Sequence, residues 1–88
     1  MYVITKTMLI GGKRKNFYYA KGPAAYCTDI NEARKFRKAD VAERLIKELG
    51  KAEYKHQKES GFDVVLDKCI EKAVKEHTIM PIFPILKN

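Results

Sequence analysis

Apolar and β-branched residues dominate the start of the chain and predict a β-hairpin there. Residues 2–10 are rich in Tyr, Val, Ile and Thr, which favour extended structure. Gly11-Gly12 follows, a pair typical of a two-residue hairpin turn. We expect residues 15–20, which carry three successive aromatic side chains, to form the return strand.

The turn also sets the expected register of this hairpin. A two-residue connection places Ile10 opposite Lys13 and therefore Ile4 opposite Tyr19. A glycine and a proline end the return strand, and a short third strand is expected at Tyr26-Cys27.

Capping signals in the middle of the chain indicate helices. Asp29 with Glu32 has capping-box spacing, which predicts one or two helical turns over residues 30–36. Asp40 with Glu43 repeats that spacing and predicts a longer helix that begins near the residue after Asp40. The apolar positions of this longer helix share one face: Val41, Ala42, Leu45, Ile46 and Leu49.

Gly50 leaves two possible ends for the longer helix. It could cap the C-terminus, and a polar strand through Tyr54 would then follow. Alternatively the helix runs through Gly50, at a cost of about 1 kcal/mol, and ends near Glu59. We favour continuation, because Ala52 and His56 project onto the apolar face and the intervening residues are mostly good helix formers.

A second amphipathic helix is expected after the turn at residues 59–61. Ser60 with Asp63 has the spacing of a helix cap. Eight positions follow the helical repeat: Phe62, Val65, Leu66, Cys69, Ile70, Ala73, Val74 and His77. Residues 61–66 alone also suit a strand, but the eight-residue match favours the helix.

The C-terminal segment, residues 78–86, is apolar and β-branched and contains Pro81 and Pro84. Proline removes a hydrogen-bond donor from a sheet, which excludes a central strand and predicts an edge strand beside the hairpin. The expected fold is therefore α+β in a single domain, residues 1–88, with two helices packed on a small sheet.

Composition places the chain among globular proteins, with 45% hydrophobic and 33% charged residues. We expect a cytoplasmic protein, because the N-terminal segment lacks the pattern of a secretory signal and no apolar stretch reaches membrane-spanning length. Cys27 and Cys69 are far apart and belong to no Cys-x-x-Cys pair. Free thiols are expected rather than a disulfide, with Cys69 in the core.

Positive charge is concentrated in the first two thirds of the chain. Residues 1–58 hold 14 basic and 6 acidic side chains, whereas residues 59–88 hold 4 and 5. If the longer helix is continuous, five cations share an arc of about 80° opposite its apolar face: Arg44, Lys47, Lys51, Lys55 and Lys58. Such a stripe suits phosphates or an acidic protein groove. It also suits an ordinary solvated face with pairs such as Glu43–Lys47, and Glu48 dilutes it.

A second basic group lies at the expected hairpin tip. Its members are Lys13, Arg14 and Lys15, followed closely by Phe17, Tyr18 and Tyr19, and Arg37 is positioned to extend the helical stripe. Aromatic and basic residues together can stack bases and hold phosphates. The alternative is that these aromatics cover the helices.

The residue spacing matches no catalytic motif, so we do not expect the protein to be an enzyme. Gly11-Gly12-Lys13 does not complete a phosphate-binding loop, because Arg14 replaces the required Ser or Thr. The two cysteines and two histidines lack zinc-site spacing. We expect no catalytic residue, no metal and no cofactor, and His77 is interpreted as a residue that interacts with a helix C-terminus.

The first half of the chain resembles a diffuse group of small phage and prophage proteins. The similar pieces are Tyr2-Val-Ile-Thr, Tyr18-Tyr19, Thr28-Asp29-Ile30 with Ala33 and Phe36, and the helix with Ala42, Ile46 and Leu49. The resemblance implies an accessory protein of a mobile element. Such proteins often bind a host machine, and some inhibit nucleic-acid-based defences.

These observations favour a small non-enzymatic binding protein. The leading hypothesis is a factor that modulates a host protein or nucleoprotein complex through the basic helix face. The alternative is a DNA- or RNA-binding module that contacts phosphates directly. A homodimer through the C-terminal segment is a further possibility.

Overall fold

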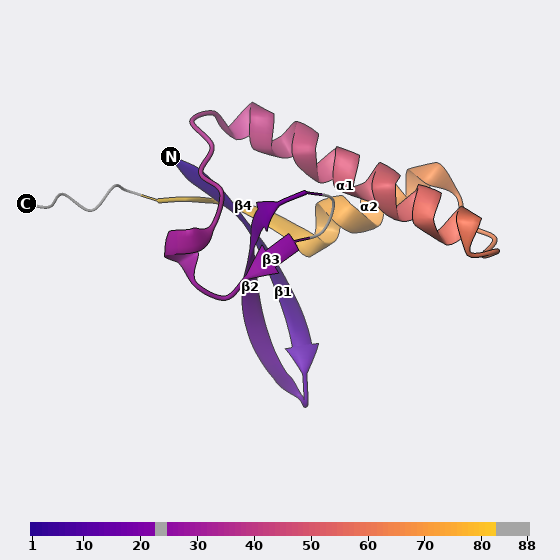
Figure 1. Ribbon diagram of the computed structural model, residues 1–88, viewed down its shortest axis with the longest axis horizontal. Helices are drawn as coiled ribbons and strands as arrows, with labels where there is room; N and C mark the ends of the chain where they lie inside the picture. Colours follow the sequence, from indigo (N-terminus) through magenta and orange to yellow (C-terminus); the bar gives the residue numbers. More distant parts are fainter. Residues whose placement is uncertain (23–24, 83–88) are drawn as a thin grey trace, which may run out of the picture.

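The computed structural model describes residues 1–22 and 25–82 and has the expected α+β fold. Four antiparallel strands form one sheet in the order β3-β2-β1-β4, and two helices pack on it (Figure 1). In chain order the elements are β1 (Tyr2–Ile10), β2 (Lys13–Lys21), β3 (Ala25–Cys27), the 3-10 turn η1 (Ile30–Glu32), α1 (Ala39–Glu59), α2 (Leu66–Glu76) and β4 (His77–Pro81).

The N-terminal hairpin forms with the predicted turn and register. Gly11 and Gly12 have φ angles of 58° and 79°, values that glycine adopts without the steric penalty of a side chain. Ile10 lies opposite Lys13, and the pairing continues without a break to Thr5 and Tyr18.

At the end of the hairpin away from the turn, residues 34–36 of the loop before α1 form hydrogen bonds with both strands. The Arg34 amide donates to the Tyr19 carbonyl at 2.9 Å, while Phe36 and Tyr2 exchange two backbone hydrogen bonds of 2.8 Å. Because these bonds hold residues 34–36 extended, the predicted helix over residues 30–36 is limited to the single turn of η1. The capping residue was predicted correctly, since the Asp29 carboxylate accepts from the Asn31 amide at 2.9 Å.

Helix α1 runs through Gly50 to Glu59, as the favoured interpretation predicted. Gly50 is buried where α1 meets α2, and a Cβ there would lie 2.8 Å from the Ile70 Cα. The missing side chain is therefore required by close helix packing, not by helix termination. The predicted capping box is wrong, because Lys38 is the N-cap residue and makes no side-chain cap bond, while Asp40 lies in the first turn.

Helix α2 begins at Leu66, later than the sequence pattern predicted. The Ser60 hydroxyl donates to the His56 carbonyl and the Phe62 amide donates to Gln57, so the chain remains attached to the end of α1. Ser60 therefore caps α1 rather than α2. Phe62 and Val65 are 63% and 59% exposed, so the N-terminal part of the apolar pattern does not contribute to the core.

Much of the remaining predicted apolar face is buried, but Val41, Leu66 and Val74 are 38%, 38% and 50% exposed. Cys69 and Ala73 of α2 are buried, and both cysteines are free thiols as expected. One cluster of buried residues joins both helices to the sheet: Ile4, Tyr19, Phe36, Ala42, Ile46, Leu49 and Ala73. No helix in residues 1–22 and 25–82 combines the length and apolar character that crossing a membrane needs.

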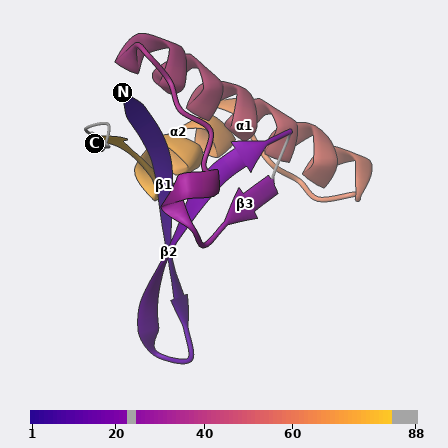
Figure 2. The same ribbon diagram turned by 60° about the vertical axis from the view of Figure 1, so that its left-hand side comes forward.

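Strand β4 is an edge strand beside β1, as predicted, and Pro81 stands at its end. Residues 78–81 of the C-terminal segment proposed for a homodimer pair with β1 of the same chain, whereas Pro84 and the other residues of 83–86 lie outside the described part of the chain. Because β4 pairs only with Tyr2–Lys6 and β3 pairs with β2 only from Tyr18 to Lys21, no strand of the described residues lies beside the end of the hairpin. We call residues 7–16 the arm, and Figures 1 and 2 show its tip pointing away from both helices.

Candidate functional site

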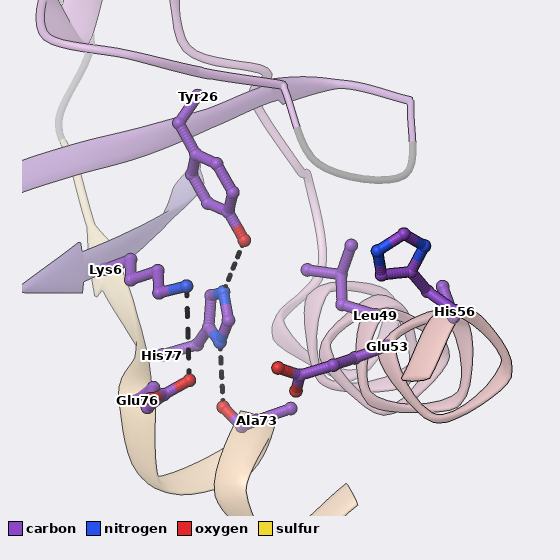
Figure 3. Close-up of a pocket in the computed structure, with 9 residues that line it drawn as sticks. Lys6, Tyr26, Leu49, Glu53, His56, Ala73, Glu76 and His77 are labelled. Atoms are coloured by element: carbon purple, nitrogen blue, oxygen red, sulfur yellow. Dashed lines mark hydrogen bonds and ion pairs between the residues drawn. The ribbon is translucent and has the colours of Figure 1, made fainter. Parts of the chain in front are cut away.

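A cavity of about 410 Å³ lies between the sheet and the two helices. Polar side chains from five elements line it: Lys6 from β1, Tyr26 from β3, Glu53 and His56 from α1, Glu76 from α2, and His77 from β4 (Figure 3). Leu49, Ala52 and Ala73 supply apolar wall.

Tyr26 and His77 form a hydrogen-bonded pair in this cavity. The His77 Nδ1 lies 2.8 Å from the Ala73 carbonyl oxygen, which can only accept, so this nitrogen carries the proton. The other nitrogen, Nε2, then accepts from the Tyr26 hydroxyl at 2.7 Å. The rings also stack with centroids 5.9 Å apart. His77 thus connects α2, β3 and β4.

Burial keeps both members of this pair uncharged near neutral pH. Desolvation lowers the pKa of His77, and the Lys6 ammonium lowers it further against the opposing effect of the Ala73 bond. Desolvation also raises the pKa of Tyr26, and the carboxylate of Glu76 adds to this shift. A neutral tyrosine that donates to a neutral imidazole is not an activated nucleophile.

The charged groups around the pair largely balance one another. Lys6 lies 4.0 Å from Glu76 and 5.4 Å from the Tyr26 ring centre, and Lys72 lies 3.5 Å from Glu53. Each carboxylate in the cavity therefore already faces an ammonium group. We call the hydrogen-bonded residues Tyr26, His77 and Ala73 the brace, because their role is structural: they hold the sheet against the helices.

The sequence interpretation found only one member of this brace. His77 was predicted to interact with a helix C-terminus, and its ring does bond the Ala73 carbonyl near the end of α2. Tyr26 was assigned to a short strand but not to this contact. Its partner is 51 residues away, and no local spacing connects the two.

Helix α1 carries no net positive charge, although the sequence predicted that its cationic stripe would be the main basic surface. Residues 1–38 contain nine basic and two acidic side chains, α1 contains five of each, and residues 60–88 contain four of each. The whole net charge of +7 therefore comes from residues 1–38. It lies on the hairpin and on the segment before α1.

The end of the arm carries three of these cations. Lys13, Arg14 and Lys15 are exposed, and no ion pair within residues 1–22 and 25–82 engages them. Their cross-strand neighbours are Ile10, Leu9 and Met8 respectively, and these apolar side chains are also exposed. The arm thus has one cationic strand and one apolar strand.

The aromatic side chains near the arm are less accessible than base stacking requires. Tyr19 is 1% exposed, and its hydroxyl donates to the Gly22 carbonyl at 2.6 Å. Phe17 and Tyr18 are half-buried at the base of the arm. Tyr19 therefore belongs to the core, as the alternative interpretation held.

A second cationic group lies at the opposite end of β1. Arg37 and Lys38 are exposed just before α1, next to Phe36, which pairs with Tyr2. Lys13 pairs with Ile10 at the other end of the strand. Eight residues of extended chain separate the two ends by about 27 Å, so the two groups do not form one continuous surface.

The predicted stripe on α1 is partly neutralised. All five of its cations are exposed, but Arg44 lies 3.9 Å from Asp40 and Lys51 lies 3.0 Å from Glu48. In the described part of the chain no ion pair engages Lys47, Lys55 or Lys58. Three helical cations therefore remain without a direct ion-pair partner among the described residues.

Comparison with known proteins identifies no relative of this chain. Neither a family model, nor a curated protein, nor a solved structure matches the chain. The origin in a mobile element therefore remains a prediction from the resemblance alone.

Proposed function

We propose that the protein is a non-enzymatic nucleic-acid-binding module that uses the arm as its main contact. One observation carries this proposal: the entire net positive charge lies in residues 1–38, and three of its cations on the projecting hairpin have no ion-pair partner within residues 1–22 and 25–82. Nucleic-acid phosphates attract such groups, and binding then depends strongly on salt.

The chemistry of the cations favours phosphates over an acidic protein surface. Lysine is depleted from protein–protein interfaces, whereas flexible ammonium groups bind phosphates as point charges. Lysine supplies two of the three cations on the arm and all three uncompensated cations on α1. The helical stripe and Arg37 would then add secondary contacts.

The resemblance of residues 2–49 to phage accessory proteins suggests a setting for this activity. In that setting the bound nucleic acid belongs to a host nucleic-acid-processing complex, which the protein modulates. This extension depends on the resemblance and requires the phosphate contacts proposed above.

Salt-dependent binding of matched charge variants tests the proposal. Fluorescence anisotropy would measure the affinity for a labelled mixed-sequence DNA duplex between 50 and 300 mM KCl. One variant combines Lys13→Gln, Arg14→Gln and Lys15→Gln. The control combines Lys47→Gln, Lys55→Gln and Lys58→Gln, which removes the same charge from α1.

We expect dissociation constants of about 10⁻⁶–10⁻⁴ M for the unmodified protein at physiological salt. The arm variant should reduce the slope of log K against log salt by about 2.7, because each lost phosphate contact contributes about 0.9. The α1 control should change the slope less. Absence of salt-dependent binding, or equal effects of the two variants, would contradict the proposal.

A further inference from the structure

The arm exposes more apolar surface than phosphate binding needs. Leu9 is 73% exposed, the highest value among the large apolar side chains of residues 1–22 and 25–82. Ile10 and Met8 beside it are 49% and 42% exposed. Apolar side chains are thus exposed on both faces at the end of the hairpin, Leu9 on one and Met8 with Ile10 on the other, and this exposure indicates a contact surface.

Cations and apolar side chains alternate across the arm in a regular way. Met8 and Ile10 lie on one face of β1, directly opposite Lys15 and Lys13 on β2. Leu9 and Arg14 form the corresponding pair on the other face. Each face therefore presents an apolar side chain beside a cation, at a cross-strand separation of about 5 Å.

The arm has a backbone shape that other proteins place in grooves of duplex DNA. It is a two-stranded ribbon, and among the described residues no strand pairs with either of its edges. Ribbons of this kind enter the major or the minor groove of double-helical DNA. Lys13 and Lys15 are two residues apart, or about 6.8 Å, so their ammonium groups can reach different phosphates of one DNA strand, which recur about every 3.4 Å along the helix axis.

We propose that the arm enters a groove of duplex DNA and that Leu9 inserts at a base step and bends the duplex. The β2 cations would hold one phosphate backbone, which places the aliphatic side chains of β1 against the sugars and base edges. Inserted leucine, isoleucine and methionine side chains unstack base steps and kink DNA. This inference rests on the proposed function, because the phosphate contacts position the wedge.

The arm fits other anionic partners less well. A membrane surface attracts cations and apolar side chains together, but it needs the apolar side chains on one face, whereas Leu9 and the pair Met8 and Ile10 lie on opposite faces of the arm. Single-stranded nucleic acid needs exposed aromatic platforms, and residues 7–16 contain no aromatic side chain. Duplex DNA is the partner in which cations and aliphatic side chains both find complementary groups.

DNA bending measured together with binding tests the wedge. The probe is a mixed-sequence DNA duplex of about 30 base pairs with central TA steps, which unstack readily, labelled at both ends for energy transfer. Anisotropy of the same duplex reports binding independently. The variant is Leu9→Ser, and Phe62→Ser is the control, because Phe62 is also exposed but lies beside the helices.

We expect the unmodified protein to raise energy transfer as it binds, and Leu9→Ser to remove at least about half of that increase. The affinity of Leu9→Ser should change by less than about fivefold, because the phosphate contacts remain. Phe62→Ser should match the unmodified protein in both measurements.

Each contrary outcome overturns a defined part of the reasoning. Binding without a change in energy transfer, or equal bending by the Leu9→Ser protein, refutes the wedge and leaves the proposed function standing. Tighter binding to the separated single strand, to an RNA duplex of the same sequence or to vesicles of anionic phospholipid refutes the choice of duplex DNA. Absence of any salt-dependent binding refutes the proposed function itself.

Discussion

Replacing Gly50 by alanine should destabilise the protein, although alanine is the better helix former. In a solvent-exposed helix this substitution stabilises by about 1 kcal/mol. Here a Cβ would meet the Ile70 Cα at 2.8 Å, the Cys69 carbonyl oxygen at 3.0 Å and the Ala73 Cβ at 3.2 Å. Two of these three contacts are with the backbone of α2, so no side-chain rotation relieves them.

The two opposing effects give a net loss of stability. Overpacking a close contact costs about 1–3 kcal/mol, and more when backbones must separate. Movement of α2 away from α1 would also loosen Ala73, which belongs to the core and accepts the His77 hydrogen bond. Because the contacts with backbone atoms place the overpacking cost at about 2–3 kcal/mol and helix propensity returns about 1 kcal/mol, we expect Gly50→Ala to lower the free energy of unfolding by about 1–2 kcal/mol.

Urea unfolding followed by circular dichroism measures this change. The control is Lys55→Gly, at an exposed position of the same helix, which should cost about 0.7–1 kcal/mol through helix propensity alone. Glycine is thus favourable at one position of α1 and unfavourable at another. A Gly50→Ala protein with unchanged or increased stability would refute the close packing of the two helices.

Three further variants or conditions test other parts of the fold. Thr5→Val should stabilise the protein by about 1 kcal/mol in urea unfolding, because the buried Thr5 hydroxyl has no hydrogen-bond partner among the described residues; a loss of stability would contradict this. Tyr26→Phe should destabilise by about 1 kcal/mol through the lost hydrogen bond to His77, and an unchanged unfolding midpoint would show that the bond contributes nothing. The folded pKa of His77 lies below its ordinary value of 6.5. At a pH below 6.5 the unfolded state therefore binds more protons than the folded state, so His77 should reduce stability as the pH falls from 7.5 toward 5. His77→Gln should remove this part of the pH dependence, and identical pH profiles for the two proteins would contradict the assignment.

Local signals in the sequence were sufficient for the hairpin and for the continuity of α1. Gly11-Gly12 fixes the turn by its own backbone preference, and the apolar pattern around Gly50 continues on one face. The start of α2 could not be predicted in this way. Phe62 and Val65 continue the helical repeat, but hydrogen bonds to the end of α1 hold this segment outside the helix.

The candidate sites depended on long-range structure to different degrees. A helical projection placed the α1 cations on one face correctly, because that geometry depends only on an unbroken helix. The prominence of the arm depends on how little of the hairpin β3 and β4 cover, which no local pattern encodes. The Tyr26–His77 contact likewise appears only when β3 and β4 approach α2.

A map of the DNA-binding surface tests the central claim most directly. Amide chemical shifts of the ¹⁵N-labelled protein would be followed as the duplex is added at low salt. If the arm is the main contact, the largest changes fall on residues 7–16, with smaller changes along the exposed face of α1. Largest changes on α1 with an unperturbed arm, or no changes anywhere, would contradict the account.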